Sequence, residues 1–480
     1  MSKNVLDRFF CVIDKLKISI PFKDDYVTAT YQTRSGDCVC YVDIKECSRR
    51  GIGLEAKTIF FTGAIGAEQY EVADLRHPYE SLPTHFTGMA FKIFQGTKFR
   101  NPCIELKASP AKILQGHNVF GPTSIEVGAL EMIMAFYNNY PDVHEMLNIE
   151  AATLDAIDAT YSARISTELQ AKQVIRQLKN VSNKQMRTSV RNEHETTVYF
   201  TKGSRHIDRK SYLKGPEFTY QLNKLRSLQA KGDKSYDRVI DVMSDPKLIN
   251  FARNLVRFEA GAHRRWLEEF GVPKNLFDAI AYQKQYETTH GSCLIADIWK
   301  KAFTPLLEAL QGQTMNVFND EEVHNKLKQT YFRYTPKGNI TYSKADKLFR
   351  FYRSLVSDGY YAVYQSFTSR QTFSRHLNDL LAIGFSKAQL QNLEGNQKDN
   401  VIIPRKLLPY DMVQRVSVLE RECPTSSNRI QDSVVIFYDK TGPSTPMMAM
   451  HLDDLLTALE IHFNRRSGVV TGALLQGYKR

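Results

Sequence analysis

A tyrosine followed two residues later by a lysine, just after a basic loop, is the arrangement in this sequence best suited to covalent chemistry. In TTVYFTKGSRHIDRKSYLKGPEF these residues are Tyr212 and Lys214, and Arg205 lies in the loop. A tyrosine oxygen can attack a phosphodiester, and nearby cations can stabilise the charge on the pentacoordinate phosphorus. If this segment is a strand, Tyr212 and Lys214 share one face and Leu213 points into the core, because side chains alternate along a strand.

The same residues also have an ordinary interpretation. The chain contains 24 tyrosines, and an exposed Tyr-x-Lys on a basic sheet needs no catalytic role. Spacing alone favours that interpretation. The other basic residues of the segment, His206, Arg209 and Lys210, are candidates for contacts with nucleic acid phosphates.

Three acidic residues interrupt apolar, strand-like segments: Glu105, Asp158 and Glu259. A carboxylate in the middle of a strand is costly unless it is solvated, paired or bound to a metal. Three in one sheet would supply the oxygen ligands that Mg²⁺ or Mn²⁺ prefers. The residues alone favour separate ion pairs, such as Glu105 with Lys107 and Glu259 with Arg257 or Arg264.

The histidines give a weaker signal. His85 and His117 are less favoured candidates for metal ligands, because a lone histidine is more often a hydrogen-bonded structural residue. The sequence has no His-Glu-x-x-His motif and no pair of histidines separated by one hydrophobic residue. It also lacks the Walker loop and the Gly-x-Ser-x-Gly elbow, which argues against a helicase and an α/β-hydrolase.

A sheet must position these residues, and strand-like patterns are frequent in the first half of the chain. Segments that alternate or are rich in β-branched and aromatic residues are 15–22, 38–44, 58–63, 88–94, 102–108, 154–163, 196–200, 209–214 and 254–260. Ser109-Pro110 and Ser124 are typical helix starts. Helical spacing is found over 166–180, 275–287, 294–311, 344–357 and 370–382. The pattern predicts an α+β fold with an antiparallel sheet, followed by an α-rich C-terminal region.

Polar segments predict where the chain divides. The clearest boundary is near Gly312, within QGQT at 311–314, and a weaker one lies at 392–400. We therefore expect three parts, 1–312, 313–400 and 401–480. The last part has a strand-like run at 433–440 and a helical run at 450–466.

A second candidate surface lies at 369–393, which reads as a helix, a short turn at Ile383-Gly384 and a second helix capped by Ser386. This is the outline of a helix-turn-helix, and Arg370, Arg375 and Lys387 would contact DNA. The segment just upstream mixes basic and aromatic residues, as DNA-contacting surfaces often do. A plain pair of helices with a basic solvent face fits the residues equally well.

Composition narrows the class of protein. Among 480 residues there are 64 Lys and Arg against 52 Asp and Glu, a formal charge of +12 that favours a polyanionic partner. The apolar fraction of 42% and charged fraction of 24% exclude a disordered or fibrous chain. No apolar stretch approaches membrane-spanning length, and the start does not resemble a signal peptide. Seven cysteines without Cys-x-x-Cys favour a reduced cytoplasm over a disulfide scaffold or a zinc ribbon.

Long stretches of the chain resemble the filamentous-phage replication initiators, the gene-II nicking endonucleases. The resemblance covers about residues 12 to 393, and the tail beyond about 400 lies outside it. The stretches that carry it include HPYESLPTHFTGMAFKIF at 77–94, ELKASPAKILQGHNVFG at 105–121, IDATYSAR at 157–164, SRH…YLK at 204–214, LVRFEA at 255–260 and LFDAI at 276–280.

This resemblance implies a function for the catalytic part, 1–312, in the cytoplasm of an infected bacterium. The protein would bind the double-stranded origin, nick the plus strand and remain joined to the 5′ phosphate through a tyrosine, which maps onto Tyr212. The free 3′-OH would prime rolling-circle synthesis by a host polymerase while a host helicase opens the duplex. The displaced single strand would then be rejoined into a circle. The resemblance also allows an oligomer on the origin and a separate shorter product starting at Met315.

The Tyr-x-Lys after a Gly-Ser-Arg loop is also similar to plasmid rolling-circle initiators, in which acidic residues hold the metal. The expected sheet is therefore HUH-like but without the His-x-His motif, and Glu105, Asp158 and Glu259 become as plausible as ligands as they are as ion pairs. Mg²⁺ would orient the phosphate, Lys214 would lower the tyrosine pKa or neutralise an oxygen, and Arg205 would hold the adjacent phosphate. The competing hypothesis is a non-catalytic origin-binding regulator, which explains the charge but gives the tyrosine loop and the carboxylates no role.

Overall fold

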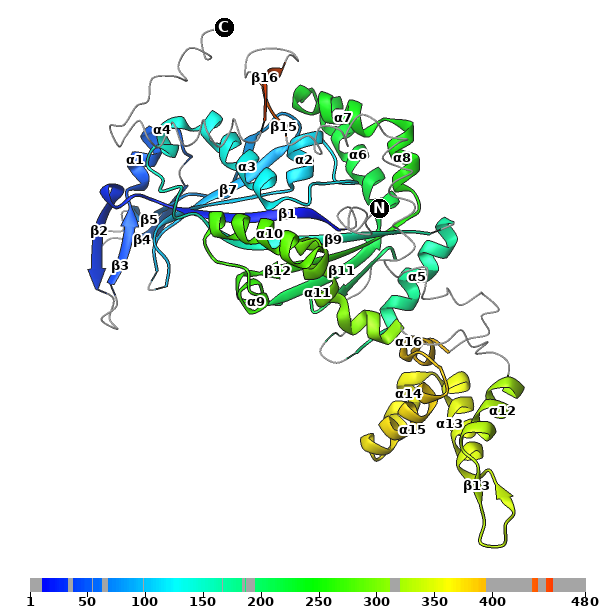
Figure 1. Cartoon of the computed structure of the whole chain (residues 1–480). Coiled ribbons are helices and arrows are strands. Elements are labelled where there is room, and N and C mark those ends of the chain that lie inside the picture. The colour runs from blue at the N-terminus through cyan, green and yellow to red at the C-terminus, as the bar shows by residue number, and fades with distance from the viewer. Residues whose placement is uncertain are drawn as a thin grey trace.

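A large antiparallel sheet is the centre of the structure, a computed structural model (Figure 1). It describes residues 11–32, 38–53, 55–62, 68–97, 99–165, 167–183, 186, 195–310, 320–393, 434–438 and 446–451. Eight strands pair in the order β10-β11-β12-β9-β1-β8-β7-β6, and every neighbouring pair is antiparallel. Their bounds are β1 Cys11–Pro21, β6 Glu80–Pro83, β7 Gly88–Phe94, β8 Cys103–Ala108, β9 Thr153–Arg164, β10 Thr197–Phe200, β11 Ile207–Leu213 and β12 Leu255–His263.

Helices bury one face of this sheet. The strands present alternating apolar side chains such as Leu16, Tyr161 and Phe258 to it, and these join one hydrophobic cluster with the helices. Trp299 packs on Tyr161 and donates a hydrogen bond from Nε1 to the carbonyl of Phe258 at 3.1 Å. The covering helices are α3 Ile125–Asn139, α10 Leu276–His290 and α11 Leu294–Leu310, with α5 Glu168–Asn180 and α9 Arg264–Phe270 beside them.

The opposite face is polar, because the same alternation points the charged residues of the strands the other way. In the register, Lys15 lies opposite Asp158 and Lys210 opposite Glu259. A shift in the pairing of β1 with β9 between Ile13 and Lys15 makes Asp14 the extra residue of a bulge. At one end of this region a small apolar cluster is built from α6 Lys214–Ala230, α7 Asp237–Met243 and α8 Pro246–Ala252.

Short elements complete the body of the protein. Two ribbons pair β2 Val27–Gln32 with β3 Cys38–Val42, and β4 Glu55–Thr62 with β5 Glu68–Arg76. The remaining short elements are α1 Ile44–Arg49, α2 Pro110–Gln115, α4 Pro141–His144 and the 3-10 turns Asp24–Tyr26 and Lys234–Tyr236. The cysteines Cys11, Cys40, Cys47, Cys103 and Cys293 are free thiols. No helix among the described residues has the length and apolarity needed to cross a bilayer.

The C-terminal helices form a second hydrophobic cluster, which includes Leu348, Tyr352, Phe373 and Leu380. They are α12 Asp320–Thr330, α13 Ser343–Asp358, α14 Tyr360–Ser366, α15 Arg370–Ala382 and α16 Lys387–Gln391, and between α12 and α13 the chain forms the ribbon β13 Arg333–Tyr334 with β14 Ile340–Thr341. The α+β fold with an antiparallel sheet and a helical C-terminal region is thus confirmed. The boundary predicted at 311–314 lies outside the described residues, so the division into 1–312, 313–400 and 401–480 stays a prediction.

Two expected elements differ from the structure. Lys214 does not end a strand but begins α6, which also contains Gly215-Pro216. A proline fits the first turn of a helix because the backbone N–H it lacks would have no partner there.

Near the C-terminus the strand predicted at 433–440 is β15 Val434–Tyr438, which pairs with β16 Pro446–His451. A helix is predicted at 450–466, but its first two residues belong to the strand β16. The rest of that segment lies outside the described residues.

Gly128 is where α3 comes closest to the sheet, and this generates a prediction. A Cβ there would lie 2.8 Å from both Leu16 Cδ1 and Pro110 Cγ. Gly128→Val should therefore lower the free energy of unfolding by about 1–3 kcal/mol, as overpacking does, measured by urea denaturation. Asn138→Val, at an exposed position of the same helix, is the matched control. Equal losses in both variants would show that the contact is not tight.

Candidate active site

Tyr212 and Glu259 form a buried pair on the polar face of the sheet. The Tyr212 hydroxyl donates to Glu259 Oε1 at 2.5 Å, and the tyrosine is only 7% exposed. Burial and the neighbouring Glu259 raise the pKa of Tyr212 well above its usual value. Burial and the charge of Asp14 likewise raise the pKa of Glu259. At neutral pH the tyrosine is therefore a phenol, and Glu259 accepts its hydrogen bond.

Lys210 joins this pair from the same strand as the tyrosine. Its Nζ lies 2.5 Å from Glu259 Oε2 and 5.4 Å from the centroid of the Tyr212 ring. Burial lowers the pKa of Lys210, but Glu259, Asp14 and Asp158 raise it by more, so the ammonium stays charged. Its side chain is 39% exposed, whereas that of Glu259 is 1% exposed. Lys210 is thus the member of the group that reaches solvent.

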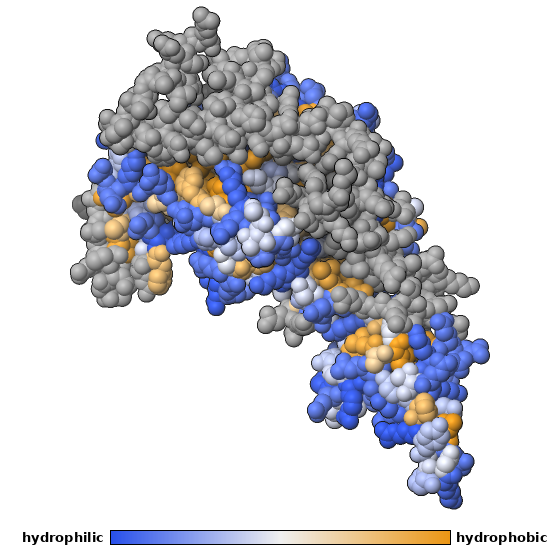
Figure 2. Space-filling view, viewed as in Figure 1, coloured by the Kyte–Doolittle hydropathy of each residue, from blue (hydrophilic) through white to orange (hydrophobic). Residues whose placement is uncertain are grey.

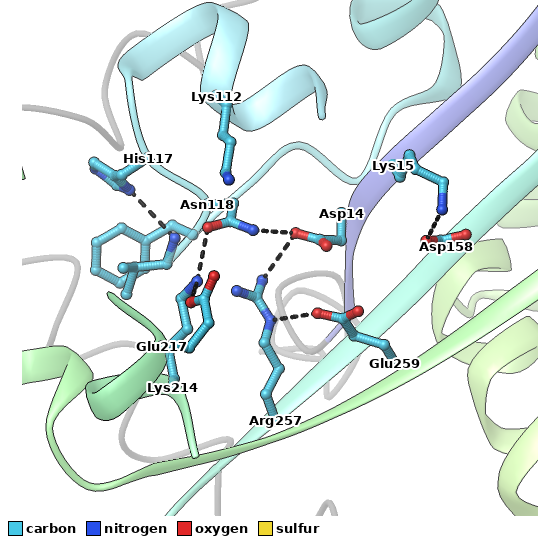
Figure 3. Close-up of polar contacts among 12 residues, drawn as sticks. Asp14, Lys15, Lys112, His117, Asn118, Asp158, Lys214, Glu217, Arg257 and Glu259 are labelled. Carbon is cyan, nitrogen blue, oxygen red and sulfur yellow. Dashed lines mark hydrogen bonds and ion pairs between the residues drawn. The ribbon is translucent and has the colours of Figure 1, made fainter. Parts of the chain in front are cut away.

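Arg257 lies opposite Tyr212 in the strand register and is fully buried, with 0% exposure. Figure 3 shows its guanidinium between two carboxylates: Nη2 is 3.6 Å from Asp14 Oδ1, and Nε is 3.7 Å from Glu259 Oε1. None of its three nitrogens has a hydrogen bond within the described part of the chain. Burial raises the pKa of Asp14, but Arg257 and Lys214 outweigh it and hold that pKa well below its usual range.

Lys214 reaches the same group from the first turn of α6. Its Nζ donates to Asn118 Oδ1 at 2.7 Å and to Glu217 Oε2 at 2.6 Å, and it is fully buried. Asn118 in turn donates to Asp14 Oδ1 at 2.7 Å, so it links the lysine to the arginine pair (Figure 3). Burial and the charge of Arg257 lower the pKa of Lys214 to about 8.

These contacts define a connected set, the Tyr212 cluster: Asp14, Asn118, Lys210, Tyr212, Lys214, Arg257 and Glu259. It contains a hydroxyl group, a carboxyl group that accepts its hydrogen bond, and buried cations. Because charges interact strongly away from water, such a set is suited to an attack that builds negative charge on an oxyanion.

The structure does not bring the three predicted metal ligands together. Asp158 accepts from Lys15 Nζ at 2.6 Å, whereas Glu105 contacts Lys17 Nζ at 2.7 Å and accepts from the Tyr79 hydroxyl at 3.0 Å. The strands β9 and β1 lie between β12 and β8, so Glu259 and Glu105 are three strand spacings, about 14 Å, apart.

One cation cannot bind both residues, because its oxygen ligands lie within about 2.6 Å. The prediction of one site for all three carboxylates is corrected on this ground. Among the described residues no three His, Cys, Asp or Glu side chains gather as a metal group. Ion pairs account for the three acids, but mainly with lysines of neighbouring strands rather than with Lys107 or Arg264.

Both candidate histidines have structural partners. His85 Nδ1 lies 2.6 Å from Arg238 Nη1. His117 Nδ1 accepts from the backbone N–H of Val119 at 3.3 Å. Burial, with Lys214 and Arg257 nearby, lowers the pKa of His117 to about 3, so its ring is neutral.

The other basic residues around the tyrosine loop are placed differently from the prediction. Arg205 is exposed just before Ile207, at the end of β11 remote from Tyr212, about 16 Å away along the strand. It cannot hold a phosphate at Tyr212. Arg209 lies on the helix-covered face, where its Nε donates to the carbonyl of Ala302 at 2.5 Å. His206 pairs with Glu269 at 2.8 Å. Of these residues, only Lys210 belongs to the Tyr212 cluster.

The helix pair at 369–393 exists, and Ser386 forms the expected cap. Its second helix, however, is buried instead of presented to a partner: Gln391 Nε2 donates to the carbonyl of Ser182 and Lys387 Nζ donates to Asn183 Oδ1, both at 3.1 Å. In this structure α16 attaches the C-terminal helices to the region of α5 and α11, so it is not exposed as a recognition helix would be. Arg370 stacks on Tyr364 at 4.1 Å, and Arg375 remains exposed on α15.

Sequence reasoning missed Asp14 and Asn118 and treated Arg257 only as a possible ion-pair partner. The signal for Asp14 and Arg257 was present, since each is a charged residue inside an apolar strand pattern. The bulge that turns Asp14 toward the arginine leaves no such signal.

Two models of the phage replication-associated protein family match the chain, the N-terminal model at residues 12–289 and the C-terminal model at 334–415. The replication-associated protein of Salmonella phage IKe is 42% identical over 428 residues, 87% of this chain and 100% of that protein. The protein of that name from Enterobacteria phage f1 is 40% identical over 80% of this chain and 92% of its own length. A solved rolling circle replication initiator protein from Geobacillus stearothermophilus covers 59% of this chain and 83% of its own at 11% identity, with a TM-score of 0.25, too low to assign any residue a role.

The burial of Lys214 makes the stability depend on pH. Its pKa of about 8 in the folded protein is below the usual lysine value of 10.5, so between these two pH values the unfolded chain binds more protons. The contribution of Lys214 to the free energy of unfolding should therefore rise with pH across this window, by up to about 1.4 kcal/mol per pH unit. Buried cysteines with raised pKa values act in the opposite direction, so the test is the difference in the free energy of unfolding between the unmodified protein and Lys214→Met, which should rise from pH 7 to 10. Lys224→Met, exposed on the same helix, should behave like the unmodified protein; a slope unchanged in Lys214→Met would refute the assignment.

Proposed function

The chain belongs to the family of phage replication-associated proteins, and from this premise we propose that it starts rolling-circle replication by nicking one strand of the origin with Tyr212 as nucleophile. The observation that carries the proposal is the hydrogen bond from Tyr212 to Glu259 beside the buried guanidinium of Arg257. The nick leaves a 3′-OH that primes synthesis, and the same tyrosine later returns the displaced strand to a closed circle.

The proposed step exchanges one phosphate ester for another. The Tyr212 oxygen attacks the scissile phosphorus while its proton passes to Glu259. The bond from phosphorus to the 3′ oxygen breaks, and that oxygen leaves with the electron pair and takes up a proton. The 5′ phosphate remains on the tyrosine. Because the ester energy is retained, a 3′-OH can reverse the step and rejoin the strand.

The buried cations account for the stabilisation of the transition state. Arg257 brings a permanent positive charge next to the tyrosine, and its nitrogens lack hydrogen bonds in the described structure, which suits them to phosphate oxygens. Lys214, with a pKa of about 8, holds a proton that it can give to the leaving 3′ oxygen near neutral pH. This role replaces the lowering of the tyrosine pKa expected for it, because the pKa of Tyr212 is raised.

Access to the tyrosine depends on Lys210. The phenol is 7% exposed, and the Lys210 side chain extends from Glu259 toward solvent over the Tyr212 ring. A DNA phosphate competes with Glu259 for the Lys210 ammonium. We propose that binding of the scissile phosphate draws Lys210 away, which frees Glu259 to accept the proton and opens the path to the hydroxyl.

A requirement for Mg²⁺ or Mn²⁺ remains a prediction from the sequence. The residues in their present arrangement do not fit a site made of all three carboxylates, since each pairs with a lysine and Glu105 is too remote. No step of the proposal therefore runs through a metal ion.

The partners of the reaction follow from the proposed step. They are the double-stranded origin, the displaced single strand, and the host helicase and polymerase, in the cytoplasm of the infected bacterium; an oligomer on the origin belongs to the same hypothesis. A non-catalytic origin-binding regulator is the alternative. It needs DNA binding alone and gives the Tyr212–Glu259 pair no function.

Removal of one oxygen tests the nucleophile. Tyr212→Phe should abolish both nicking of supercoiled origin plasmid and the covalent protein–DNA adduct, while origin binding stays within about twofold, because a phenyl ring cannot form the ester. Tyr220→Phe, at a position 70% exposed on α6, is the matched control and should nick normally. Nicking by Tyr212→Phe at the full rate would exclude the assignment. Unmodified protein that binds the origin but never nicks it would support the regulator.

Glu259→Gln tests the proton acceptor. The amide keeps the shape of the side chain but cannot accept the phenol proton, so the rate of nicking should fall by about 10²–10⁴. In the unmodified protein the rate should also decrease as the pH falls below the raised pKa of Glu259, because a protonated carboxyl is no base.

Glu105→Gln is the matched control for this experiment. It also alters a buried carboxyl, three strands away, and should change neither the rate nor the dependence on divalent cations. A Glu259→Gln protein with normal activity would remove the base from the mechanism. A shifted metal titration in Glu105→Gln would instead restore Glu105 as a ligand.

A further inference from the structure

The ribbon of β13 and β14 extends from the C-terminal helices away from the large sheet (Figure 1). Its strands pair Arg333 with Thr341 and Tyr334 with Ile340. The turn is closed by backbone hydrogen bonds from Thr335 to Asn339 at 2.8 Å and from Gly338 to Thr335 at 2.9 Å, and Gly338 takes a φ of 79°. The glycine permits this left-handed turn. The ribbon is therefore a defined hairpin.

Contacts to α15 anchor the base of the hairpin. The Tyr331 hydroxyl donates to the carbonyl of Asp379 at 2.8 Å, and Lys344 Nζ donates to Asp379 Oδ1 at 2.9 Å. Lys344 also lies 4.2 Å from the centroid of the Tyr331 ring. These contacts hold both ends of the ribbon against the helical cluster while its tip points outward.

One face of the hairpin is apolar and uncovered. Because side chains alternate and Tyr334 lies opposite Ile340, the flanking Phe332 and Tyr342 fall on that same face. The exposed fractions are 46% for Phe332, 68% for Tyr334, 50% for Ile340 and 37% for Tyr342. We call these four residues the hairpin platform. Exposed aromatic groups of this kind mark binding surfaces, since water solvates them poorly.

Positive charge surrounds the platform. From Lys326 to Arg350 the sequence has seven lysines and arginines and one acidic residue, Asp346. Arg333 and Lys337 are exposed on the hairpin itself, and Lys328 Nζ lies 5.6 Å from the Tyr342 ring centroid. Figure 2 shows hydrophilic and hydrophobic residues interleaved at this end of the molecule. An apolar protein partner would not need this excess of cations. A nucleic acid matches both features, because its phosphates pair with the cations and its bases stack on the aromatic rings.

We propose that the hairpin platform binds single-stranded DNA, with unpaired bases stacked on Phe332 and Tyr334 and phosphates held by Lys328, next to Tyr342, and by Lys337 at the turn. Stacking selects a single strand, because the bases of a duplex already stack on one another and leave only phosphates for contact. The choice of DNA rests on the proposed function, in which nicking displaces a single strand. Among the described C-terminal elements, α16 is buried against the large domain, whereas the hairpin is exposed.

Binding of a labelled single-stranded oligonucleotide by the full chain tests this surface. The double variant Phe332→Ala, Tyr334→Ala should weaken binding by at least about tenfold, the loss expected for two stacked bases. Tyr361→Ala, at a position 50% exposed on α14, is the matched control and should change it little. Binding of duplex DNA should be much less affected by the double variant.

The salt dependence separates stacking from charge. The double variant Lys328→Gln, Lys337→Gln should reduce the slope of log affinity against log salt by about 1.4, for two phosphate contacts to a single strand. Phe332→Ala, Tyr334→Ala should leave that slope unchanged. Unchanged single-strand affinity in the aromatic variant, or an equal loss for duplex DNA, would overturn the proposal.

Nicking distinguishes failure of this proposal from failure of the proposed function. Tyr212→Phe should bind the single strand as the unmodified protein does, because the nucleophile and the platform are separate surfaces. If the aromatic variant loses single-strand affinity while the unmodified protein never nicks, the platform is supported and the proposed nuclease is wrong. If nicking is normal and the aromatic variant binds fully, the platform is wrong and the nuclease stands.

Discussion

The buried positive charge of Arg257 is the constraint on which the rest of the site depends. An isolated charge in a protein interior costs several kcal/mol, and removing one partner of a buried pair leaves the other uncompensated. Asp14 and Glu259 therefore have to remain next to Arg257, and their carboxylates are held in place by its charge. Glu259 then has one oxygen directed at Tyr212 and the other at Lys210, so it accepts the hydrogen bond of the tyrosine hydroxyl.

The groups around this arginine come from parts of the chain that differ in conformation. Asp14 is presented by a bulge in β1, because the extra residue rotates the chain and points that side chain to the polar face. Asn118 comes from the loop after α2, and Lys214 comes from the first turn of α6. The cluster thus lies between the sheet on one side and a helix and a loop on the other. This enclosure excludes water from the buried cations, so their electrostatic interactions are stronger than in solvent.

The C-terminal helices contribute a surface of a different kind. Their attachment to the large domain uses polar contacts of α16 with the end of α5, so the helix that resembles a recognition helix is occupied in the folded chain. The exposed groups lie instead on the hairpin between α12 and α13, where aromatic rings and cations alternate. In the two proposals, the buried cluster carries out the covalent chemistry and the exposed hairpin binds the single strand.

The sequence by itself determined the kind and order of most elements, the antiparallel sheet and the helical C-terminal region, because alternation and helix caps are local signals. It also placed Glu259 in a strand. The Tyr-x-Lys spacing alone did not single out a nucleophile, and Tyr212 became the candidate only through the resemblance to the phage initiators. Only the tertiary structure decided that Glu259 rather than Glu105 meets Tyr212, that Asp14 and Arg257 belong to the same cluster, and that Arg209 and α16 pack against other parts of the chain. Strand order, register and bulges are set by packing between residues that are distant in the chain, and no local pattern records them.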